Sequence, residues 1–139
     1  CISPVPPRGM PLMQRPHAPI QRLDDAELAS LGVELFVKRE DLIDAEISGN
    51  KWRKLKYNTL EAISLEAPRI LTFGGAFSNH IAATAACGAV CGIETVGIVR
   101  GEEADLQNPT LSMAVSKGMS VVRVSRERYR TLTRGHLGE

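Results

Sequence analysis

Residues 69–80 have the sequence RILTFGGAFSNH, which joins a short apolar run, two glycines and a polar triplet. The apolar run predicts a buried strand at 69–73, and the two glycines break it. Ser78 or Asn79 can cap a helix that continues through an Ala-rich stretch as far as Gly92. A strand, a turn and a helix in this order predict the repeating unit of an α/β fold.

Strands and helices alternate in the same way on both sides of this segment. The other predicted elements, in chain order, are a short helix near 24–30, a strand at 33–39, a helix from Ser48 to about Glu66, a strand at 94–100, a helix near 107–117, a strand at 120–124 and a helix beginning after Ser125. Such alternation predicts a parallel sheet covered on both faces. We therefore expect an α/β fold of three layers, with a parallel (βα) sheet in the middle.

Composition argues against several classes of protein. The 139 residues suffice for one domain, and 17 Lys and Arg against 16 Asp and Glu give a net charge of +1. So balanced a charge predicts no nucleic-acid partner, and no apolar run reaches the roughly 18 residues that span a membrane. Three cysteines, an odd number, argue against a disulfide framework, so we expect a reducing, cytoplasmic setting.

The N-terminal leader is rich in proline. Six of the eight prolines lie between Pro4 and Pro19. Proline has no backbone N–H, so we expect an extended arm or a disordered tail here and neither a helix nor a central strand. At the other end, the alternation stops at 135–139 where a further element is due. We therefore expect the chain to be part of a longer protein.

Lys51 is predicted to lie in the first turn of the helix that Ser48 caps. The unpaired backbone N–H groups there carry partial positive charge, and Arg53 and Lys54 add two cations. Both effects favour the neutral amine, the form in which a lysine attacks an aldehyde. Lys54 shares a helix face with Lys51 and could hold a phosphate group. A solvated basic helix start is the alternative that the residues leave open.

The turn at 74–80 also allows two interpretations. Glycines let a backbone approach a ligand, and a helix start offers N–H groups to an anion, but many such turns are only turns. His80, Cys87 and Cys91 follow at intervals of seven and four residues and invite a metal-site interpretation. A closed zinc site needs about four converging ligands, so we expect no metal here and interpret the cysteines as small buried apolar residues.

Two motifs resemble one family of enzymes. KREDL at 38–42, followed by SGNKWRKL at 48–55, is similar to the signature of fold-type II pyridoxal-phosphate enzymes, the tryptophan synthase β superfamily. The Asn-Lys-x-Arg-Lys-Leu form resembles the branch of D-cysteine desulfhydrases and 1-aminocyclopropane-1-carboxylate (ACC) deaminases. The spacing from Lys51 to Ser78 and Asn79 agrees with it. The resemblance covers nearly the whole chain but only the N-terminal part of the family's length.

This resemblance implies pyridoxal 5'-phosphate as the cofactor, bound through a Schiff base to Lys51 and with its phosphate near Lys54. It implies that Ser78 and Asn79 bind the substrate carboxylate and that Asn79 contacts the ring oxygen of the cofactor. Ser78 is also a candidate for proton transfer near the α-carbon. His80 stands where ACC deaminases tend to have glutamine, and it is a further candidate for substrate binding.

The implied activity is that of a lyase or deaminase acting on a small amino acid. The reaction of a D-cysteine desulfhydrase, which gives a 2-oxo acid, ammonia and sulfide, is preferred, and ACC deamination is the alternative within the family. A non-catalytic α/β domain that binds an anionic metabolite, or a subunit of a larger assembly, is the alternative from another class. In the full-length form residues 1–48 would join a large cofactor domain, residues 49–139 would form a small substrate domain, and two copies would form a homodimer.

Overall fold

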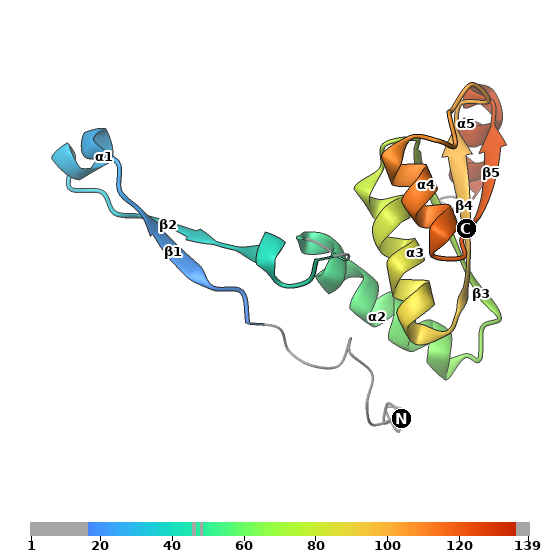
Figure 1. Cartoon of the computed structure of the whole chain (residues 1–139), viewed down its shortest axis with the longest axis horizontal. Coiled ribbons are helices and arrows are strands. Elements are labelled where there is room, and N and C mark those ends of the chain that lie inside the picture. The colour runs from blue at the N-terminus through green and yellow to red at the C-terminus, as the bar shows by residue number, and fades with distance from the viewer. Residues whose placement is uncertain (1–16, 46, 48, 136–139) are drawn as a thin grey trace.

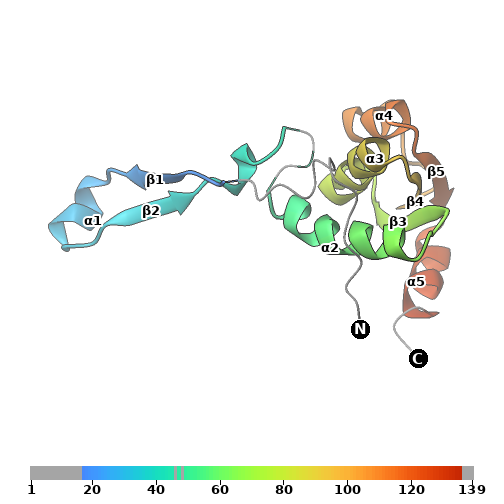
Figure 2. The ribbon, with the colours of Figure 1, turned by 90° about the horizontal axis from the view of Figure 1, so that it is seen from below.

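The computed structural model describes residues 17–45, 47 and 49–135. Its N-terminal part is an antiparallel hairpin of β1 (Ile20–Leu23) and β2 (Leu35–Lys38). Between these strands lies α1 (Ala26–Ser30), whose first free N–H groups donate to the side chain of Asp25. Both views of the ribbon show the hairpin projecting from the rest of the molecule (Figures 1 and 2).

The other elements form one α/β lobe. In chain order they are the 3-10 turn η2 (Glu40–Leu42), α2 (Asn50–Ser64), β3 (Arg69–Gly75), α3 (Asn79–Cys91), β4 (Glu94–Arg100), α4 (Pro109–Ser116), β5 (Ser120–Val124) and α5 (Arg126–Gly135). The last three strands form a parallel sheet in the order β3-β4-β5, so each pairs with the next strand along the chain. The predicted α/β class with a parallel sheet is confirmed.

Successive residues of β4 point to opposite faces of this sheet. On one face Val99 is fully buried in the same apolar cluster as Ile81 of α3. On the other face Arg100 lies 5.8 Å from the centre of the Tyr129 ring of α5. Phe73 of β3 meets the same ring at 5.9 Å, close to perpendicular. Helices therefore lie on both faces of the sheet, which gives the expected three layers.

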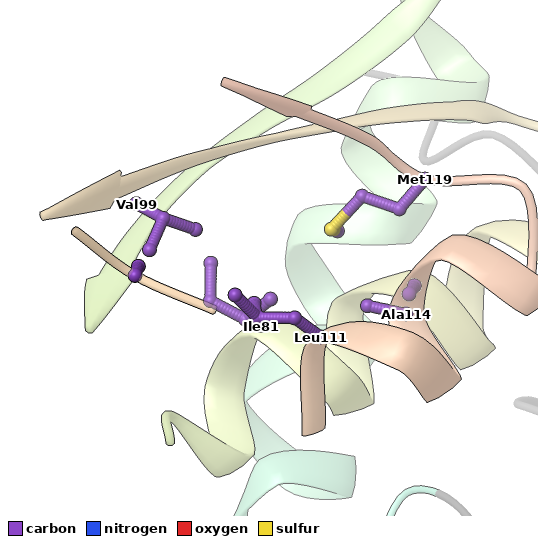
Figure 3. Close-up of a cluster of buried hydrophobic side chains, with 7 residues drawn as sticks. Ile81, Val99, Leu111, Ala114 and Met119 are labelled. Carbon is purple, nitrogen blue, oxygen red and sulfur yellow. The ribbon is translucent and has the colours of Figure 1, made fainter. Parts of the chain in front are cut away.

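Two apolar clusters stabilise the lobe. The first fills the space between the sheet, α3 and α4, and Figure 3 shows its side chains, of which Ile81, Val99, Leu111, Ala114 and Met119 are labelled. The second joins α2 to α3 and contains Ile47, Trp52, Leu55, Ala83, Ala86 and Cys87. All eight residues from 81 to 88 are buried, and most of them are small. Small side chains let α3 approach both α2 and the sheet closely, so α3 is the central element of the lobe.

Several sequence predictions can be compared with these elements. The strands predicted at 94–100 and 120–124 are confirmed by β4 and β5. The prediction that the glycine pair ends the preceding strand is wrong, because β3 continues through Gly75 and pairs with β4 along its whole length. Residues 4–16 of the proline-rich leader lie outside the described residues, and the division into two domains at 48/49 stays a prediction. Within the described ranges, no helix is both long and apolar enough to span a membrane.

Candidate functional site

Lys51 lies in the first turn of α2, as predicted. The structure has Gly49 as the N-cap of this helix, and the predicted cap, Ser48, lies outside the described residues. Gly49 has a φ of 65°, in the left-handed region that favours glycine, and it has no side chain to accept the free N–H groups. The Nζ of Lys51 donates a hydrogen bond to Oδ1 of Asn50 at 3.0 Å. The neighbouring amide thus orients the amine.

The side chain of Lys51 lines a cavity of about 410 Å³ between the starts of α2 and α3 and the body of α4. Asn50, Asn79 and Met113 line the same cavity. Its volume falls within the range of small-molecule sites, roughly 300–1,000 Å³. The structure therefore brings together the candidate amine and one of the two polar residues that were predicted from the second motif.

His80 lies close enough to Lys51 and Lys54 for their positive charges to act on its imidazole. Burial lowers the pKa of its imidazole, and the positive charges of Lys51 and then Lys54 lower it further. The imidazole is half-buried, and the backbone carbonyl of His80 accepts a hydrogen bond from the Thr84 hydroxyl at 2.8 Å. A neutral imidazole can both donate and accept a hydrogen bond, so His80 can serve as a polar contact beside the two lysines without adding a charge.

Ser78 is placed differently. It is the N-cap of α3, and its Oγ accepts the N–H of Ile81 at 3.5 Å. It lines a second cavity, of about 650 Å³, together with Arg100 and Asn108. This cavity lies at the carboxyl ends of β3 and β4, where ligands bind in open parallel sheets. The two members of the Ser-Asn pair thus line adjacent cavities, and Asn79 alone of the pair lines the Lys51 cavity.

The sequence predictions assign no role to two residues at or near the Lys51 site, Glu40 and Met113. Glu40 belongs to the KREDL motif, and its carboxylate binds Arg53 through two contacts of 2.6 and 2.8 Å and Lys38 at 3.0 Å. The Arg53 hydrogen bond, followed by that of Lys38, lowers the pKa of Glu40 to about 2. Met113 supplies an apolar wall from α4. The motif itself could have indicated Glu40, whereas nothing in the sequence near Met113 indicates a site.

The two described cysteines are not part of this site. Cys87 is buried, and Thr59 lies 3.1 Å from its sulfur, so the sulfur has a polar neighbour within an apolar cluster. A hydrogen bond from Cys91 lowers the pKa of the Cys87 thiol to about 7, and Cys91 retains its proton more strongly in turn. Across the described parts of the chain, no group of three or more His, Cys, Asp and Glu side chains could hold a metal ion.

The chemistry of these groups fits the cofactor that the motifs imply. An amine at a helix start lies in a cavity of small-molecule size. The free N–H groups of that helix start suit a phosphate group, whereas Lys54 is exposed and does not line this cavity. Asn79 offers an amide to a ring substituent in the same cavity. Lys51 and Asn79, with the start of α2, could therefore hold pyridoxal phosphate.

Comparison with known sequences supports the same family, although no family model matches the chain. A Thermotoga maritima protein provisionally named an ACC deaminase is 40% identical over 98 residues, which are 70% of this chain and 31% of that protein. A mitochondrial protein of Arabidopsis thaliana, named a bifunctional D-cysteine desulfhydrase/ACC deaminase, is 40% identical over 84 residues, 60% of this chain and 20% of its own. The chain thus spans less than a third of the length of these relatives.

Comparison with solved structures supports the same resemblance. A crystal structure titled as that of an ACC deaminase homologue matches with a TM-score of 0.66 and 30% identity, covering 78% of this chain and 32% of the other. A mutant O-ureido-L-serine synthase with bound O-ureido-L-serine matches with a TM-score of 0.62 over 95% of this chain and 40% of the other; its 18% identity shows the fold alone. The two relatives and the ACC deaminase homologue confirm the resemblance predicted from the motifs: over 60–78% of its length the chain is similar to part of the D-cysteine desulfhydrase and ACC deaminase family.

Proposed function

We propose that the full-length protein is a pyridoxal-phosphate-dependent lyase or deaminase of small amino acids and that Lys51 holds the cofactor. The observation that carries this proposal is the shared cavity, in which the amine at the start of α2 lies with Asn79 from the start of α3. The names of the relatives, ACC deaminase and D-cysteine desulfhydrase, support the class of substrate.

The residues would divide the work as follows. Lys51 would hold the cofactor, and its free amine would take the proton from the substrate α-carbon. When bound, the cofactor supplies an electron sink for that carbon. The family resemblance supports the other roles: Lys54 would bind the phosphate, Asn79 would donate to the ring oxygen, and Ser78, from the cavity that it lines, and His80 would contact the substrate. Loss of the thiol group from cysteine and uptake of one water give a 2-oxo acid, ammonia and hydrogen sulfide.

Replacement of Lys51 by alanine tests the assignment of the amine. In the full-length protein, Lys51→Ala should abolish the visible absorption of bound pyridoxal phosphate, because among the described residues the lysine amine in that cavity is Lys51. Borohydride reduction followed by peptide mapping should place the label on Lys51 in the wild type. Lys54→Ala is the matched control, and it should weaken binding but keep the absorption. A label on Lys54 or Lys38 would contradict the proposal.

We further propose that D-cysteine desulfhydration is the preferred reaction and that ACC deamination is the lesser one. Opening of a cyclopropane ring needs a base or nucleophile against a methylene carbon, whereas loss of a β-thiol needs only proton removal at the α-carbon and a good leaving group. His80 supports this choice, because the family resemblance leads us to expect glutamine in an ACC deaminase. An imidazole has a different donor pattern from an amide.

Side-by-side assays would separate the two reactions. In the full-length enzyme, sulfide release from D-cysteine should exceed release of 2-oxobutanoate from ACC. His80→Gln should shift the ratio of the two rates toward ACC. Faster turnover of ACC by the wild type would reverse the choice of substrate and leave the assignment of Lys51 intact.

A further inference from the structure

We infer that Glu40 is a positioning residue, which holds the helix start that carries Lys51; this inference rests on the proposed function. Glu40 lies in η2, directly after the hairpin, and its side chain is 24% exposed. It contacts α2 on both sides of Lys51, through its backbone and through its carboxylate. It does not line the Lys51 cavity, so it acts on the amine through other residues.

The first contact is made by the main chain. The N–H of Gly49, the N-cap of α2, donates to the carbonyl oxygen of Glu40 at 3.2 Å. This hydrogen bond binds the residue just before the helix to η2. Lys51 follows Gly49 by two residues, so this hydrogen bond limits how far the Lys51 backbone can lie from η2.

The second contact is made by the carboxylate. Its two oxygens accept hydrogen bonds from Nε and a terminal nitrogen of Arg53 at 2.6 and 2.8 Å. A two-point contact between a guanidinium and a carboxylate fixes orientation as well as distance. Lys38 of β2 adds a further ion pair at 3.0 Å. Lys51 therefore lies midway between two attachment points, Gly49 and Arg53, that both lead to Glu40.

The helices α3 and α4 begin at a residue whose side chain caps the helix, whereas the N-cap residue of α2 provides no such cap. Ser78 caps α3 and Asn108 caps α4 with a side-chain oxygen that accepts free N–H groups of the first turn. Gly49 cannot do so because it has no side chain. Among the described residues no side chain caps the start of α2, and a helix start without such a cap frays more readily. In α2, Glu40 supplies from outside the helix the restraint that the cap residue cannot supply.

The test uses four variants of the full-length protein. Glu40→Gln and Arg53→Gln each remove the charge pair with little change in size, and the double variant removes both partners. Asp41→Asn is the matched control, because it changes the neighbouring Arg39–Asp41 pair, at 2.7 Å, whose side-chain hydrogen bond outside the pair goes to Gln21 of β1. Two quantities are measured: amide hydrogen exchange in the cofactor-free protein, and the rate at which pyridoxal phosphate and borohydride label Lys51.

Exchange in the peptide covering 49–54 should rise roughly 1.5- to fivefold in Glu40→Gln, the range expected for an exposed ion pair, and stay unchanged in α4. Labelling of Lys51 should slow roughly tenfold, because a small misplacement of a reacting group is costly. Arg53→Gln and the double variant should resemble Glu40→Gln, since both side chains act as one unit. Asp41→Asn should match the wild type in both measurements.

The outcomes separate this inference from the proposed function. If Glu40→Gln leaves both exchange and labelling at wild-type values, or if Asp41→Asn has the same effect as Glu40→Gln, the positioning role is wrong. If the wild type is not labelled at Lys51 at all, the proposed function is wrong, and the exchange measurement still decides whether Glu40 restrains the helix start. If the double variant is far worse than either single variant, the two residues do not act through each other.

Discussion

Asn79 lines the same cavity as Lys51 and stands at the first position of α3. It is exposed, and the capping of α3 depends on Ser78 instead. Its replacement should therefore affect a bound ligand without disturbing the helix. We predict that Asn79→Ala in the full-length protein shifts the cofactor absorption and weakens cofactor binding, because the ring oxygen loses a donor. Spectral titration checks this, with an unchanged thermal midpoint as the control; an unchanged spectrum and affinity would refute the role.

Glu40 should also give stability a characteristic pH dependence. Its pKa is lowered from 4.5 to about 2 in the folded protein. A carboxyl with a lowered pKa stabilises the fold above about pH 4.5, and this contribution is lost as the pH falls toward 2. We predict that the wild type is more stable than Glu40→Gln at pH 7 and that the two curves converge as the pH approaches 2. Urea unfolding at a series of pH values measures this, and parallel curves would contradict it.

Single residues also show how far the sequence could be interpreted. Lys51 could be predicted because a helix start and a sequence motif indicate the same position. The placement of Ser78 in a neighbouring cavity could not, because the direction of a side chain in a turn depends on the local backbone, and there the Ser78 hydroxyl faces the N–H of Ile81. The link from Glu40 to Arg53 joins residues 13 positions apart through long side chains, which no local pattern reveals.

Among the elements, α3 depends most closely on small residues. Gly88 lies on its buried face, and a Cβ placed there would come within 2.7 Å of the backbone carbonyl oxygen of Ile93. A backbone atom cannot move aside as a side-chain end can. We predict that Gly88→Ala lowers the free energy of unfolding by about 1–3 kcal/mol, although alanine is the better helix former. Urea unfolding checks this, with Ala89→Gly on the exposed face as a comparison that should cost only about 1 kcal/mol.

The elements differ in how well sequence pattern predicts them. The strand β4 lies between Gly92 and Gly101, and β5 lies between Gly118 and the helix start at Ser125, so their bounds follow from the pattern alone. The strand β1 is not predicted, because it is short, exposed along its length and formed by pairing with β2. Such pairing joins segments separated by a helix, so its cause is not local. For this reason the sequence predicts the parallel sheet but does not predict the hairpin.

At the scale of the whole molecule, stability should be concentrated in the lobe. Ile81 is fully buried among α3, α4 and the sheet, whereas Phe36 of the hairpin is 53% exposed. We predict that Ile81→Ala lowers the free energy of unfolding by about 2–5 kcal/mol and that Phe36→Ala changes it by less than about 0.5 kcal/mol. Urea unfolding of both variants measures the contrast. Equal losses would mean that the hairpin contributes to the core.

The order of the strands in the sheet has a consequence for folding of the protein during its synthesis on the ribosome. Because β3, β4 and β5 pair in the order in which they are synthesised, each new strand finds its neighbour already present. The helices α3 and α4 return the chain across one face between these steps, so none of the three strands has to insert between two that are already paired. The lobe can therefore assemble while translation continues, one strand and one helix at a time, with the Lys51 helix already packed against its first layer.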